Sequence, residues 1–100
     1  MIRDEVMSKL RDALPGLRTQ YGLKDLYLFG SVARGDDRAD SDVDILMEFE
    51  PEARPTLGTF GGIMDDLEKL LGRRVDVVEN HPGLRPVFRQ LVDQDKLRVA

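Results

Sequence analysis

The chain has 100 residues, of which 41% are hydrophobic and 34% are charged, and its formal net charge at pH 7 is −4. A chain of this length predicts one domain, residues 1–100, with a single core and no room for a second domain that binds a bulky acceptor. The acidic balance argues against binding along a nucleic acid backbone, because such proteins usually carry a basic stripe.

The sequence also bears on where the protein works. No apolar run approaches the roughly 20 residues of a membrane-spanning helix, and the opening MIRDEVMSKL lacks the apolar segment of a secretory signal. The chain contains no cysteine, which excludes disulfides and thiolate metal sites. We therefore expect a soluble, cytoplasmic domain with no direct nucleic acid or membrane partner.

The N-terminal quarter predicts a helix followed by a strand. From Ile2 onward apolar residues recur along one helical face, and Pro15 and Gly16 are expected to end or bend this helix. The segment 25–30, DLYLFG, is short, apolar and aromatic, which predicts a buried strand closed by Gly30.

The second predicted strand has two different faces. One face carries Val43, Ile45, Met47 and Phe49, and the other carries Asp42, Asp44, Leu46 and Glu48. The first face belongs to the core, whereas the second begins with two carboxylates.

The second half of the chain predicts a further strand between two helices. The expected elements are a loop at 50–55, a helix at 57–71 capped by Thr56 and stopped by Gly72, a strand at 74–78 and a helix at 86–92. The connection between the second and third strands is long enough for a right-handed crossover, so these strands should be parallel. The predicted fold class is α+β with an α/β-like character, a small mixed sheet flanked by helices.

Three carboxylates are expected at one edge of this sheet. Asp42 and Asp44 point to the same side of one strand, and Asp76 lies near the start of the neighbouring parallel strand. Such groups repel one another unless a cation is bound, and Mg²⁺ takes one or two carboxylates with water and substrate phosphates. The three aspartates therefore predict a magnesium site, with two metal ions if Asp76 completes it.

A phosphate site is expected beside the carboxylates. Gly30 lets the backbone approach an anion closely, Ser31 offers a hydroxyl and an N–H at the start of a helical turn, and Arg34 follows one turn later. Ser31 joins the site only if the first strand runs antiparallel to the second. Arg73 and Arg74 are interpreted either as favourable charges at a helix end or as partner contacts.

These residues carry a family resemblance. Gly30 and Ser31, then ten residues, then Asp42 and Asp44 resemble the signature of nucleotidyltransferases related to DNA polymerase beta. The longer strings FGSVARG, SDVDILMEF and VDVV resemble the minimal nucleotidyltransferase (MNT) antitoxins. The resemblance implies the palm-like fold of that superfamily and transfer of AMP from ATP, with Mg²⁺, to an acceptor hydroxyl. It assigns catalysis and metal binding to Asp42, Asp44 and Asp76, and the nucleotide to Gly30, Ser31 and Arg34.

The resemblance also implies a partner. MNT antitoxins are paired with helical HEPN ribonuclease toxins, and the implied reaction adds AMP to a toxin tyrosine within a hetero-oligomer. Two alternatives stay open: an antitoxin that masks its toxin by binding alone, and an enzyme that transfers a nucleotide to a small molecule. Enzymes of the latter kind generally carry an additional acceptor-binding domain.

Overall fold

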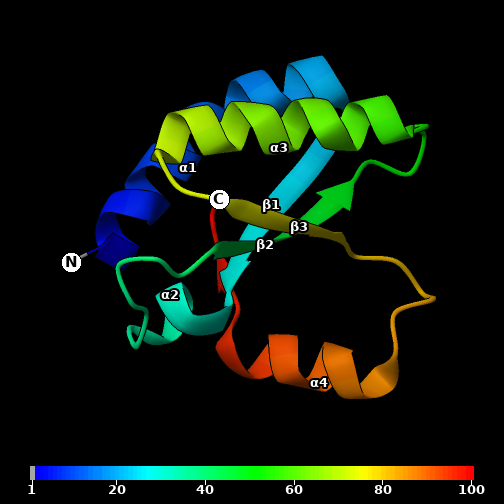
Figure 1. Cartoon of the computed structure of the whole chain (residues 1–100). Coiled ribbons are helices and arrows are strands. Elements are labelled where there is room, and N and C mark those ends of the chain that lie inside the picture. Colours follow the sequence, from blue (N-terminus) through cyan, green and yellow to red (C-terminus); the bar gives the residue numbers. More distant parts are fainter. Residues whose placement is uncertain (1) are drawn as a thin grey trace.

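The computed structural model describes residues 2–100, which fold as a mixed sheet between two pairs of helices (Figure 1). In chain order the elements are α1 (Ile2–Tyr21), β1 (Leu23–Phe29), α2 (Gly30–Arg34), β2 (Val43–Phe49), α3 (Leu57–Leu71), β3 (Val75–Glu79), α4 (Pro86–Asp95) and β4 (Leu97–Arg98). The sheet order is β3-β2-β1-β4. α1 and α3 lie on one face of the sheet, and α2 and α4 lie on the other. The predicted fold class is confirmed.

The strand directions agree with the prediction. β1 pairs antiparallel with β2, and β2 pairs parallel with β3. Consequently the last residue of β1 and the first residues of β2 and β3 meet at one edge of the sheet. We call the residues gathered there, Gly30, Ser31, Asp42, Asp44 and Asp76, the acidic edge.

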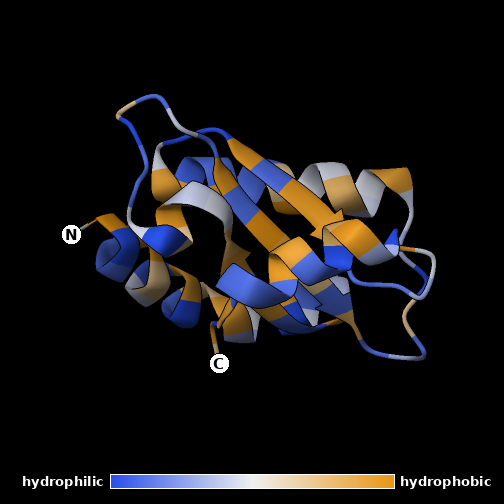
Figure 2. Ribbon diagram, turned by 90° about the horizontal axis from the view of Figure 1, so that it is seen from below, coloured by the Kyte–Doolittle hydropathy of each residue, from blue (hydrophilic) through white to orange (hydrophobic). Residues whose placement is uncertain are grey.

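The face of β2 toward α1 and α3 forms the core, as its alternation predicts. Val43, Ile45 and Met47 are fully buried there, together with Leu26 and Leu28 of β1. Burial of each such side chain contributes about 1.5–3 kcal/mol before the entropy of ordering it is subtracted. Seen from below, hydrophilic bands interrupt the otherwise hydrophobic strand ribbons (Figure 2). The opposite face is thus free to carry polar residues.

α1 does not end at Pro15, contrary to one reading of the sequence. Leu14 and Leu17 are both buried, so core packing continues on either side of the proline, which lies on the exposed side of the helix. Water can take the hydrogen bond that the missing proline N–H leaves unmade. The helix ends at Gly22, where φ is +76° and the N–H donates to the Arg18 carbonyl. Neither α1 nor any other helix within residues 2–100 is long and apolar enough to cross a membrane.

α3 begins and ends where the sequence predicts. The Thr56 hydroxyl accepts a hydrogen bond from the Thr59 N–H at 3.2 Å, and Gly72 closes the helix at a φ of +67°. Gly62 on this helix has a packing role, because a Cβ there would lie 3.1 Å from the Tyr21 hydroxyl of α1. That hydroxyl donates to Asp66 of α3 at 2.6 Å, which raises the pKa of Tyr21 to about 12. The two helices are thereby joined by a polar contact as well as by the core.

The C-terminal segment differs most from the prediction. α4 extends three residues beyond the expected end, and β4 was not predicted at all, because two residues are too short to show a strand pattern. β4 pairs with β1 at Tyr27 and Leu28. Through this pairing the C-terminus adds an edge strand and brings Arg98 beside Asp25.

Candidate functional site

The register of the parallel pair places two aspartates side by side at the acidic edge. Asp44 of β2 is the partner of Asp76 of β3, and each is the second residue of its strand. Partners in neighbouring strands lie about 4.8 Å apart and point to the same face. Asp42 immediately precedes β2 and is half-buried, whereas the Asp76 side chain on the edge strand is exposed. The structure therefore brings the three predicted carboxylates to one edge.

Asp44 lies directly against the backbone of Gly30. A Cβ built on Gly30 would lie 3.0 Å from the Asp44 Cγ and closer still to Oδ2. Gly30 also has a φ of +77°, a region that side chains disfavour. Both observations require glycine at this position, so the Gly-Ser turn is fitted to the second aspartate of the Asp-x-Asp pair.

The electrostatic environment of Asp44 disfavours its charge. Partial burial raises the pKa of Asp44 above its usual value, and the negative charges of Asp76 and Asp42 raise it further, against a smaller opposing effect of Arg34. Among residues 2–100 no side chain donates a hydrogen bond to the Asp44 carboxylate or forms an ion pair with it. Within residues 2–100 the Asp44 charge therefore has no direct partner.

The donor set suits magnesium only in part. Within the described residues, no group of three His, Cys, Asp or Glu side chains is arranged to hold a metal ion. The Asp42 carboxylate is instead 3.3 Å from the guanidinium of Arg74. Mg²⁺ needs no complete protein cage, because it takes one or two carboxylates and completes its shell with water and phosphate oxygens. The Asp44 and Asp76 pair fits that requirement, whereas the predicted three-carboxylate, two-metal arrangement is not assembled in this geometry.

The predicted phosphate residues lie on α2, the short helix beside the acidic edge. Ser31 is half-buried in the first turn, and its carbonyl accepts the N–H groups of Gly35 and Asp36. Arg34 is paired with two carboxylates, Asp36 at 3.1 Å and Asp95 at 2.8 Å. In this geometry Arg34 ties α2 to α4, and a phosphate contact would require it to exchange one of these partners.

Arg73 has a structural role that sequence reasoning did not assign. Its Nη2 donates to the carbonyls of Arg38 at 2.8 Å and Ser41 at 2.7 Å, and its Nη1 lies 3.6 Å from Asp37. These contacts hold the connection that delivers Asp42 to the acidic edge. The only signal in the sequence is the position of Arg73 just before β3, since β3 neighbours β2, the strand that follows this connection.

Comparison with known proteins identifies the class. A family model described as a nucleotidyltransferase domain matches residues 8–98. The chain therefore belongs to the nucleotidyltransferase domain family.

Three individual proteins show the similarity in more detail. The protein adenylyltransferase MntA of Thermococcus cleftensis is 43% identical over 75 residues, which are 75% of this chain and 74% of that protein. A solved structure described as a candidate minimal nucleotidyltransferase is 39% identical, with a TM-score of 0.73, over 93% of this chain and 92% of that one. The MNT antitoxin solved with a tri-AMPylated Shewanella oneidensis HEPN toxin has a TM-score of 0.60 at 21% identity, over 99% of this chain and 69% of that one, and shares the fold.

Proposed function

We propose that this nucleotidyltransferase is an antitoxin that transfers AMP from ATP to a hydroxyl, a tyrosine in our proposal, of a partner HEPN toxin. The observation that carries the proposal is the uncompensated Asp44 carboxylate, held against Gly30 and in register with Asp76. A fold that leaves such a charge unpaired beside a Gly-Ser turn is suited to a cation and a phosphate chain.

Each residue of the acidic edge has a role in this proposal. Gly30 and Ser31 would hold the triphosphate, because glycine permits close approach and the serine offers a hydroxyl and an N–H. Asp44 and Asp76, joined by Asp42 once its carboxylate leaves Arg74, would hold Mg²⁺, which supplies positive charge against the phosphate oxygens when it is bound. Asp44, fixed between two strands, would set the position of the nucleotide. Arg34 would contact a phosphate after exchanging Asp36 or Asp95.

The exposed position of Asp76 suits an acceptor that is itself a protein. In the reaction the acceptor oxygen bonds to the α-phosphorus, the bond to pyrophosphate breaks, and the hydroxyl loses its proton. Asp76 lies on the edge strand with its side chain open to solvent, so a hydroxyl approaching from outside can reach it. We assign to Asp76 the acceptance of that proton.

Two relatives support the partner. One similar protein is named as a protein adenylyltransferase, and the Shewanella structure contains an MNT antitoxin with an AMPylated HEPN toxin. AMP on a tyrosine adds volume and negative charge, which would repel RNA phosphates from a ribonuclease site.

The deciding experiment is mass spectrometry of this protein and the product of the adjacent gene after incubation with ATP and Mg²⁺. We expect the partner to gain the mass of one or more AMP groups. The double variant Asp42→Ala and Asp44→Ala should lose this transfer, while Asp40→Ala, an exposed aspartate of the preceding connection, should retain it.

The same experiment separates the alternatives. A partner that is neutralised without gaining AMP, with protection retained in the double variant, would replace the enzyme with a masking antitoxin.

A further inference from the structure

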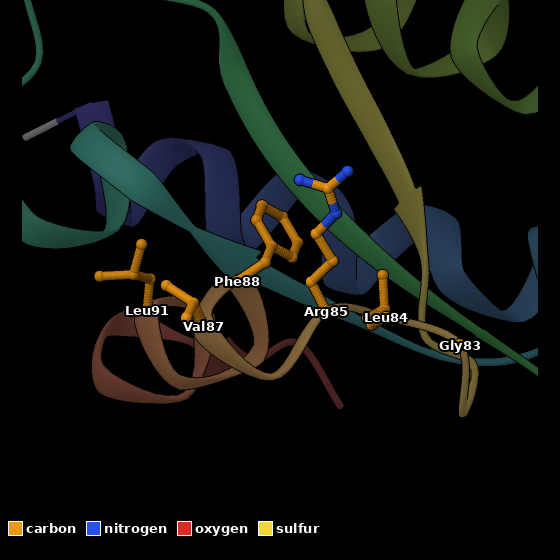
Figure 3. Close-up of a pocket in the computed structure, with 6 residues that line it drawn as sticks. All are labelled: Gly83, Leu84, Arg85, Val87, Phe88 and Leu91. Atoms are coloured by element: carbon orange, nitrogen blue, oxygen red, sulfur yellow. The ribbon is translucent and has the colours of Figure 1, made fainter.

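An apolar groove lies along α4 and the loop that precedes it. Its volume is about 530 Å³, and it is lined by Gly83, Leu84, Arg85, Val87, Phe88 and Leu91. In Figure 3 the side chains of Arg85, Phe88 and Leu91 extend from α4 and the loop before it toward the sheet. Val87 is 69% exposed and Leu91 is 56% exposed, so neither is explained by the core.

This groove is connected to the acidic edge by two contacts. The Phe88 ring packs edge-on against Phe29 at a centroid distance of 6.0 Å, and Phe29 is the register partner of Asp44 and the residue before Gly30. At the other end of α4, Asp95 is paired with Arg34 of α2. Leu91 precedes Asp95 by about one helical turn, a rise of about 6 Å. The groove therefore runs along α4 away from the place where the triphosphate would lie.

We propose that this groove binds the base of the nucleotide, an inference that rests on the proposed function and names a second part of its substrate site. A purine has two flat apolar faces and a polar rim. Val87, Phe88 and Leu91 provide apolar surface for the faces, and the volume lies within the usual range of small-molecule sites.

The Arg85 side chain can bind either the polar rim of a purine or the face of its ring. Among the residues that the structure describes, its guanidinium forms no hydrogen bond or ion pair, unlike that of Arg89, which donates to Asn80 and His81. A free guanidinium in an apolar groove can stack on a base or donate to its ring nitrogens. None of the six lining residues is acidic, so nothing in the groove opposes a nucleotide by charge.

Calorimetric titration of the purified chain tests the proposal with two probes, ATP and inorganic tripolyphosphate, each with Mg²⁺. The test variant is Val87→Ser with Leu91→Ser, since both side chains are exposed and their loss should leave the fold intact. The matched control is Leu57→Ser, an 88% exposed leucine at the start of α3. We expect the test variant to bind ATP about tenfold more weakly and tripolyphosphate unchanged, because only ATP carries a base. The control should bind both as the unaltered protein does.

Two results would overturn the base site: unchanged ATP affinity in the test variant, and equal weakening of ATP and tripolyphosphate binding. If ATP affinity is unchanged and the KM for the protein acceptor in the AMP-transfer assay is raised, the groove belongs to that acceptor. Failure of the proposed function has a different signature, namely no AMP transfer to the partner while the difference between ATP and tripolyphosphate persists.

Discussion

Asp25 and Asp44 lie on the same face of neighbouring strands, but among the described residues only Asp25 has a partner for its charge. Asp25 of β1 is only 1% exposed, yet one carboxylate oxygen accepts the Leu26 N–H at 2.8 Å and the other is paired with Arg98. Asp44 of β2 is less buried, but no described side chain compensates it and two carboxylates lie nearby. Burial alone therefore does not distinguish the two carboxylates; what distinguishes Asp44, the residue that we propose to be functional, is burial without a partner.

The charges of Asp25 and Asp44 also have different effects on the protein. The Asp25 pair joins β4 to β1 across 73 positions of sequence, so it stabilises the architecture. Asp44 carries a charge that its surroundings disfavour, so either protonation of Asp44 or a cation bound beside it would stabilise the folded chain. Our proposal thus gives stability to Asp25 and activity to Asp44, and substitution can test each one separately.

The largest effect is expected at Asp44. Asp44→Asn should lower AMP transfer by about 10³-fold or more, because it removes the carboxylate fixed against Gly30. The same substitution should raise the melting temperature at pH 7, since it removes a charge that Asp76 and Asp42 repel. Calorimetry and the transfer assay measure the two effects. A variant that is both inactive and less stable would contradict our account of Asp44.

The gain in stability that we expect from Asp44→Asn should depend on pH. Because the folded-state pKa of Asp44 is raised, the folded chain binds the proton more tightly than the unfolded chain, whose reference value is 3.8. The ionised Asp44 side chain therefore destabilises the folded state fully at pH values above its raised pKa. At pH values well below 3.8 this destabilisation is absent. The stability advantage of Asp44→Asn should be full at neutral pH and disappear in acid.

A smaller effect is expected from the glycine that Asp44 contacts. Gly30→Ala should destabilise the fold by about 2 kcal/mol or more, because alanine is strained at positive φ and its Cβ meets the Asp44 carboxylate. Gly61→Ala is the matched control, since nothing lies within 4 Å of a Cβ there and alanine favours the helix by about 0.5–1 kcal/mol. In an Asp44→Ala background the cost of Gly30→Ala should fall, and equal costs in both backgrounds would mean that the contact is unimportant.

The smallest effect concerns Asp25, because its partner Arg98 is 63% exposed and the pair is therefore partly solvated. Arg98→Met should lower the denaturation midpoint, because it leaves a fully buried carboxylate oxygen without its ionic partner. Arg74→Met, which breaks the exposed pair with the half-buried Asp42, should leave the midpoint nearly unchanged. Equal midpoints for the two variants would remove the distinction between a structural and a functional aspartate.

Much of the architecture follows from local rules that the sequence displays. The alternation of Val43, Ile45 and Met47 with Asp44 predicted both faces of β2, and Thr56 and Gly72 predicted the ends of α3. These features are readable because side-chain direction repeats every two residues in a strand, and because caps act within a single turn. The crossover rule then predicted the parallel pairing that sets Asp44 beside Asp76.

The sequence by itself therefore determined three of the four strands, the parallel pairing of β2 with β3, and the Gly-Ser and Asp-x-Asp residues. Only the tertiary structure decided that α1 continues through Pro15, that Arg34 binds Asp95, that Arg73 holds the connection before Asp42, and that α4 presents an apolar groove. Each of these depends on groups far apart along the chain, whose meeting is fixed by packing of the whole core rather than by any local pattern.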